Sequence, residues 1–94
     1  MRVVFTAAAL ADLDEILGYT EANYPSLTIR VEHRIRDVIA RIGEWPRNAR
    51  ALDGQPDIRV VPLIRYPYKI FYRIIGDTVE ILHLHHTARR PWPE

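Results

Sequence analysis

After residue 57 the hydrophobic period of this chain changes from a helical repeat to a period of two, and this change limits the possible folds. Between residues 7 and 43, apolar side chains recur every three or four positions, as on one face of a helix. From residue 58 to residue 85 the period changes to two, as in strands; over residues 69–75 apolar side chains occur on both faces and charge on one face. A chain of 94 residues is too short for each half to build its own core. We therefore expect one domain over residues 1–94, in which helices pack on a sheet.

The first half is expected to form a strand over residues 2–6 and then two helices. Thr6 is a suitable N-cap for a helix over about 7–24, because its hydroxyl can accept a backbone N–H. A proline then breaks the helix, and Ser26 is expected to cap a second helix over about 26–43. So short a connection makes a helical hairpin. The inward residues expected for the first helix are Leu10, Leu13, Leu17 and Tyr24, and its outward acids are Asp12, Asp14, Glu15 and Glu21.

The second half predicts a loop followed by three strands. Residues 45–57 are rich in turn-forming residues, and no regular structure is expected there. Period-two alternation predicts strands at about 58–64, 69–75 and 78–85. Consecutive strands joined by short turns pair antiparallel. The expected fold is α+β with the order β-α-α-β-β-β, a helical hairpin packed on a small, twisted, mainly antiparallel sheet.

Basic residues are concentrated in the second half. Residues 1–46 carry a net charge of −2 and residues 47–94 carry +3, which gives +1 overall. Alternation places Lys69 and Arg73 on one face of their strand, and Arg59 and Arg65 share a face of the preceding strand. We expect these four to form a basic patch on the sheet surface away from the helices. Such a patch either solvates the open face of the sheet or contacts an anionic target, and both interpretations stay open.

Two histidines, His83 and His85, point the same way on the last predicted strand, and imidazole is a good zinc or copper ligand. No cysteine is present, however, and the nearest carboxylate in sequence is Glu80, so no metal site is expected. A hydrogen-bonded structural histidine, a contact to an anion or a general base is favoured instead. The acids of the first helix are expected to be solvated surface.

Several classes of protein are excluded or disfavoured by what the sequence lacks. It contains no P-loop, dinucleotide fingerprint or nucleophile elbow, so no cofactor is expected. The absence of cysteine fits a reducing compartment. The first residues form neither a signal peptide nor a membrane span. We therefore expect a cytoplasmic protein without a membrane partner.

A series of local motifs, in a fixed order, resembles one known family. The motifs are an opening strand ending Phe5-Thr6, a helix of the form Ala-x-Ala-Asp-Leu-x-x-Ile, the run Tyr66-Pro67-Tyr68-x-x-x-Tyr72, a Gly-Asp turn, Ile81-Leu82-His83 and His86-Thr87-Ala88-Arg89. Taken together, the chain resembles the ParE branch of the RelE/ParE superfamily of bacterial toxins.

The resemblance implies a type II toxin that blocks DNA gyrase and replication. It also implies a ParD-like antitoxin whose C-terminal segment wraps the toxin, with operator DNA contacted only through that antitoxin. A toxin of this kind binds its target and needs no catalytic residue. The expected target contacts are Arg59, Arg65, Lys69, Arg73, Arg89 and Trp92.

The RelE branch suggests an alternative, a ribosome-dependent endoribonuclease that cuts messenger RNA. Lys69 lies where those nucleases have a basic residue on the sheet, and Arg89 lies where they have a late arginine. The terminal tyrosine of those nucleases has no counterpart, because Trp92 cannot exchange a proton. A net charge of +1 is also small for a protein that grips RNA. The nuclease residues would be Lys69, Arg73, His83, His85, His86 and Arg89.

Overall fold

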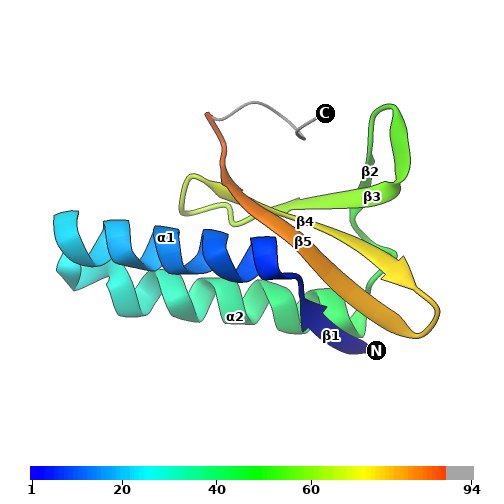
Figure 1. Ribbon diagram of the computed structural model, residues 1–94, viewed down its shortest axis with the longest axis horizontal. Helices are drawn as coiled ribbons and strands as arrows, with labels where there is room; N and C mark the ends of the chain where they lie inside the picture. Colours follow the sequence, from blue (N-terminus) through cyan, green and yellow to red (C-terminus); the bar gives the residue numbers. More distant parts are fainter. Residues whose placement is uncertain (89–94) are drawn as a thin grey trace.

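The computed structural model describes residues 1–88 and contains a helical hairpin and a five-stranded sheet (Figure 1). The elements in chain order are β1 (Arg2–Phe5), α1 (Ala7–Asn23), the 3₁₀ turn η1 (Pro25–Leu27), α2 (Thr28–Glu44), β2 (Arg50–Leu52), β3 (Gln55–Pro62), β4 (Tyr68–Ile75) and β5 (Thr78–His86). The predicted α+β class and the order of the hairpin and the last three strands are confirmed. Within the described part, no helix is long and apolar enough to span a membrane.

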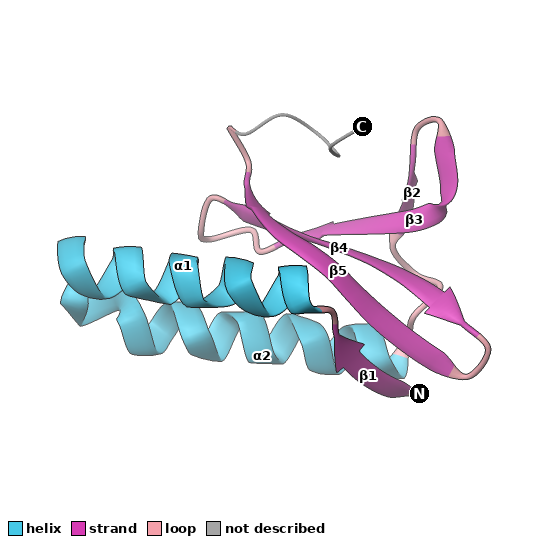
Figure 2. Cartoon of the chain, in the orientation of Figure 1, coloured by secondary structure: helices cyan, strands magenta, loops and turns pink. Residues whose placement is uncertain are grey.

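The sheet has the strand order β1-β5-β4-β3-β2. β1 pairs with β5 in parallel, and the other three pairings are antiparallel. The helices lie side by side along one face of this sheet (Figure 2). Helix residues such as Ile16 and Ile35 join Ile70 and Tyr72 of β4 in one core cluster. A smaller cluster on the other face joins Phe71 to two residues of β3.

The loop expected over residues 45–57 is wrong in its second part. Residues 50–52 form β2, and β3 begins at Gln55, so a tight hairpin replaces irregular chain. Gly54 occupies the turn with a φ of 79°, a conformation that glycine adopts without strain. The turn residues were read as a loop signal, although they are also the signal of a hairpin.

Of the two predicted helix N-caps, one is confirmed and one is wrong. The hydroxyl of Thr6 accepts the backbone N–H of Ala9 at 3.1 Å, which confirms it as the cap of α1. Ser26 does not cap α2, because a 3₁₀ turn intervenes and the helix starts one residue after Leu27. A tight turn of this kind joins the helices without a side-chain cap.

The inward face of α1 also differs from the prediction. Leu13 and Leu17 pack against the core as expected, and Ala9, Ile16 and Thr20 are buried as well, whereas Leu10 is 51% exposed. Tyr24 lies at the end of the helix and is also exposed. The middle of the expected stripe is therefore confirmed, and its two ends are wrong.

Candidate functional site

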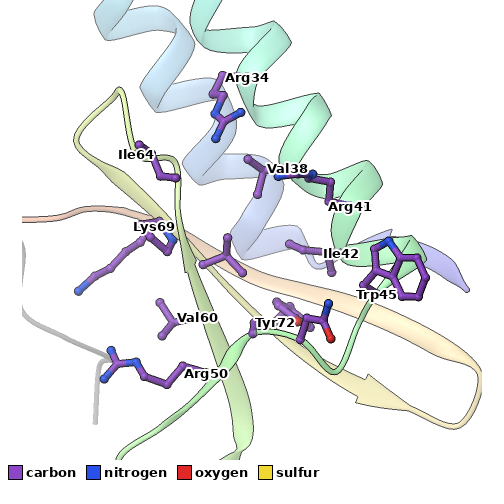
Figure 3. A pocket seen from close by; sticks show the side chains of 14 residues that line it. Arg34, Val38, Arg41, Ile42, Trp45, Arg50, Val60, Ile64, Lys69 and Tyr72 are labelled. Carbon is purple, nitrogen blue, oxygen red and sulfur yellow. The ribbon is translucent and has the colours of Figure 1, made fainter.

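A groove of about 740 Å³ lies between α2 and the outer part of β3 (Figure 3). Its lining is mainly apolar, with Val38 and Ile42 from the helix facing Val61 and Tyr72 from the sheet. Four cationic side chains also line it, and they are Arg34, Arg41, Arg50 and Lys69. An apolar surface bordered by like charges is suited to a ligand with both apolar and acidic groups.

Regular helical spacing builds one wall of the groove. Arg34, Val38, Arg41 and Trp45 follow one another at intervals of four, three and four residues, so they lie along one flank of α2 and its C-terminal cap. The side chain of Trp45 is exposed, at 63% of its maximum. The Arg34 Nε donates a hydrogen bond to the carbonyl of Leu63 at 3.0 Å, which joins this wall to the sheet.

The opposite wall is a stretch of β3 that has no outer strand beside it. The pairing between β2 and β3 ends at Arg50 and Val60, so Val61 and Pro62 border the groove directly. Ile64 follows at the rim with a φ of 69°, and its side chain is 79% exposed. A β-branched residue in this region of φ is uncommon and strained. The chain therefore keeps a costly conformation that presents an apolar side chain to solvent.

Tyr72 forms part of the groove's floor and is fixed by a short hydrogen bond. Its hydroxyl donates to the carbonyl of Pro46 at 2.6 Å, which holds the loop after α2 against the sheet. Burial raises the pKa of Tyr72 above its ordinary value of 10.0, and the nearby guanidinium of Arg59 acts in the opposite direction. The phenol is therefore neutral at physiological pH and acts as a structural donor.

The four cations expected to form one patch do not share one surface. Arg59 pairs in register with Tyr72 and lies on the face that carries the helices. Its Nη1 donates to the carbonyls of Arg47 and Ala49 at 3.1 and 2.8 Å. The expectation was wrong because alternation shows which residues share a face of a strand, and pairing decides which face that is.

The other predicted contacts are spread over the opposite face and the loop before β4. The Lys69 Nζ lies 5.6 Å from the centroid of the Phe71 ring. The Arg73 Nε donates to Glu80 Oε1 at 2.8 Å across the pair of strands. Arg65 is exposed in the loop. Arg89 and Trp92 lie outside the described residues.

Sequence reasoning missed most of the groove. Arg34 and Arg41 were not singled out and Trp45 was assigned to a loop, although their spacing along one flank was readable. Arg50 was assigned to an irregular loop, and β2 in fact brings it level with Val60. The groove depends on the pairing of strands, and local sequence patterns do not show which strands pair or in which register.

A second polar cluster lies where α1 meets β5. Asp12 Oδ2 is 2.9 Å from His83 Nδ1 and accepts the backbone N–H of Leu84 at 3.0 Å. His85, only 4% exposed, packs its ring 4.8 Å from that of His83 and 5.2 Å from that of Phe71. Asp12 was expected to point into solvent, and this was wrong, because α1 lies directly beside β5.

His86, the third histidine of the predicted motif, lies apart from this cluster. Its side chain is exposed, and its Nδ1 accepts the backbone N–H of Ala88 at 3.1 Å. Its ring also contacts the edge of Tyr68. The structure therefore brings together two of the three histidines and adds a carboxylate that is distant in sequence.

Comparison with known proteins agrees with the fold and the motifs. Residues 3–91 match the family model described as the ParE toxin of the type II toxin-antitoxin system parDE. Y4kP of Sinorhizobium fredii is 38% identical over 94 residues, which cover 99% of this chain and 94% of that protein. Toxin RelE2 of Caulobacter vibrioides is 33% identical over 89 residues, which cover 94% of this chain and 97% of that one.

The fold has a counterpart among solved structures. A chain of the chromosomal ParDE toxin–antitoxin system from P. aeruginosa superposes with a TM-score of 0.80 at 23% identity. The match covers 92% of this chain and 95% of that chain, and it shows a common fold. Together with the family match over nearly the whole sequence, this settles the classification. The chain belongs to the ParE family of toxins from type II toxin–antitoxin systems, within the RelE/ParE superfamily.

Proposed function

We propose that this toxin arrests growth by binding DNA gyrase in the cytoplasm, and that a ParD-like antitoxin neutralises it. In this mechanism the toxin makes and breaks no covalent bond. It occupies a surface of the topoisomerase and so prevents the enzyme from completing its cycle. The match to the parDE family model supports this choice over the RelE branch.

The proposal rests mainly on the burial and the contacts of the histidines that a nuclease would need. His85 is buried, and His83 contacts Asp12. Cleavage of RNA by its 2′-hydroxyl requires a base within hydrogen-bond reach of the substrate and cations aimed at the phosphate. Groups already engaged inside the protein are poorly suited to those tasks. Contact with a protein surface makes no such demand.

The proposed gyrase contacts are cationic side chains of the open sheet face, together with an arginine and a tryptophan that follow β5 in the sequence. Lys69 and Arg73 belong to the first group, with Arg65 in the adjoining loop. Arg89 and Trp92 belong to the second, and arginine and tryptophan are enriched among residues that dominate binding energy. Arg59 is the weakest of the predicted contacts, since two backbone carbonyls already engage its guanidinium.

The groove beside α2 is the proposed docking site for the antitoxin. Its apolar lining fits the apolar face of a helix or an added strand, the two common ways in which a short segment binds. The cations Arg34, Arg41 and Arg50 favour acidic residues in that segment. The exposed side chains of Trp45 and Ile64 then provide apolar anchors at either end.

A supercoiling assay with purified gyrase tests the gyrase proposal. Inhibition by the toxin, relieved by the cognate antitoxin, is the expected result. The double variant Arg89→Ala, Trp92→Ala should lose inhibition and keep the wild-type circular dichroism spectrum. A matched control, Arg36→Ala, removes an exposed arginine that pairs with Glu32 on α2, and it should inhibit fully. Absence of inhibition by folded wild-type toxin would overturn the proposal.

The second candidate function is ribosome-dependent cleavage of messenger RNA. Two observations favour it. Toxin RelE2 is 33% identical to this chain, and His86 is exposed at the end of β5, beside β4, which carries Lys69. In that case His86→Gln should abolish cutting of translated messenger, as mapped by primer extension. Intact messenger during growth arrest would remove this candidate.

A further inference from the structure

We propose that Asp12, His83 and His85 form a binding site for a divalent transition-metal ion, with zinc as the reference ligand. The three residues each offer a ligand atom, and these atoms lie within 4.8 Å of one another. Two imidazole nitrogens and one carboxylate oxygen are a donor set used for zinc and related metals. The proposal does not depend on whether gyrase is the toxin's target.

The fold itself brings the two histidines together. They stand two residues apart on β5, so the strand directs both rings to the same side, with centroids 4.8 Å apart. A bulge between β4 and β5 adjoins this point, since Phe71 pairs with His83 and Tyr72 with Ile81. Bulges re-aim side chains near functional sites. Here the bulge precedes the first histidine of the pair.

Asp12 completes the set from a distant part of the sequence. Its Oδ2 atom is 2.9 Å from His83 Nδ1. Two ligand atoms bound to one zinc at about 2.0–2.1 Å are separated by about 3.3 Å in a tetrahedral arrangement. The observed separation therefore fits either a hydrogen bond in the metal-free protein or two ligands of one ion.

The carboxylate is oriented by a contact outside the ligand set. The backbone N–H of Leu84 donates to Asp12 Oδ2 at 3.0 Å, which fixes the side chain beside both histidines. Such second contacts hold metal ligands in position in known sites. The side chains of Asp12 and His83 keep 18% and 26% exposure, so an ion can enter from solvent, while His85 forms the buried end.

The charged groups near the site lower its affinity for zinc but still allow zinc to bind. Lys69 is the register partner of His85 on β4 and places a positive charge nearby. Asp12 supplies the one carboxylate of the set and offsets it. A neutral variant, Lys69→Gln, should therefore bind zinc more tightly than the wild-type toxin.

Zinc titration by isothermal calorimetry, with the metal-free toxin, tests the site. We expect one zinc per chain and a melting temperature that rises with zinc concentration. Asp12→Asn, which can still accept the Leu84 N–H, and His85→Gln should each weaken binding by more than the roughly 10- to 100-fold typical of outer-contact substitutions. His86→Gln and His33→Gln change exposed histidines and should bind as the wild type does.

A spectroscopic arm keeps the proposal open to refutation if a variant folds poorly. In wild-type toxin labelled with ¹⁵N, zinc should shift the imidazole nitrogens of His83 and His85 and leave those of His33 and His86 unchanged. Cobalt should give visible absorption bands that Asp12→Asn lacks. The proposal fails if wild-type toxin binds no zinc in competition with a weak chelator. It also fails if binding survives Asp12→Asn and disappears in His86→Gln.

Discussion

The sheet has a short strand at each edge, β1 at one and β2 at the other. At each edge the neighbouring long strand extends beyond the short one, and the two protruding segments have different surroundings. Next to β1, pairing with β5 ends at Ile81, and α1 then covers the strand, with Asp12 accepting the Leu84 N–H. Next to β2, pairing with β3 ends at Val60, and the strand continues along an open groove. An exposed strand edge is a site where another chain can bind. The edge of β5 is therefore covered by α1 and donates a hydrogen bond to it, whereas the edge of β3 remains available for a partner.

The largest expected effect concerns the open edge. Trp45→Ala removes an exposed aromatic anchor and should weaken antitoxin binding by about 2 kcal/mol or more, roughly 30-fold. The urea midpoint of the free toxin should hardly change. Tyr19→Ala removes an equally exposed aromatic from α1 and serves as the control in the same calorimetric titration. Equal losses for both variants would show that the groove is not the antitoxin site.

The closed edge should respond in stability rather than in binding. Asp12→Ala leaves the Leu84 N–H without its acceptor and removes the His83 contact, so the free energy of unfolding should fall by about 1–3 kcal/mol. Asp14→Ala, on the exposed side of the same helix, should stay within about 0.5 kcal/mol of wild type. Urea denaturation measures both. A variant Asp12→Ala as stable as Asp14→Ala would contradict the distinction between the edges.

The smallest effect concerns the loop that connects the groove to the core. Tyr72→Phe loses the hydrogen bond to Pro46 and should cost about 1 kcal/mol at neutral pH, again measured in urea. Antitoxin affinity should fall only slightly, because the ring remains in the groove's floor. A loss of binding as large as that of Trp45→Ala would mean that the hydroxyl orders the groove.

Tyr72 should also make the free energy of unfolding depend on pH in the alkaline range. Burial raises the folded-state pKa of both Tyr68 and Tyr72 above 10.0. The contribution of these phenols is therefore fully present below pH 10 and is lost as the pH rises through the folded-state pKa values. Urea midpoints between pH 8 and pH 11 should fall less steeply for Tyr72→Phe than for wild type.

Much of the fold was readable from local pattern because the relevant forces are local. The Thr6 cap, the apolar stripe of α2 and the turn at Gly76 each depend on neighbours within a few residues. In α2, Val31, Ile35, Val38 and Ile42 recur at helical spacing in the sequence, and all four are buried. The stripe of α1 was correct at Leu13 and Leu17 and wrong at Leu10, because the helix buries the small side chain of Ala9 there instead.

The candidate sites were less readable, because both depend on contacts between distant segments. Lys69 and Arg73 were correctly placed on one face of β4, but Arg59 came to lie on the other side of the sheet. The histidine pair was visible as a local motif. Its carboxylate neighbour is 71 residues away along the chain and was read as solvated surface.

The sequence by itself determined the α+β class, the helical hairpin, the three long strands and the toxin family. These follow from periodicity and from motifs whose order survives without knowledge of contacts. The tertiary structure alone decided which face each cation occupies, where β2 ends, and that Asp12 meets the histidines of β5. The reason is physical: strand register and helix placement are set by burial of the whole core. A shift of one residue exchanges the inward and outward side chains of a strand and turns the inward face of a helix by about 100°.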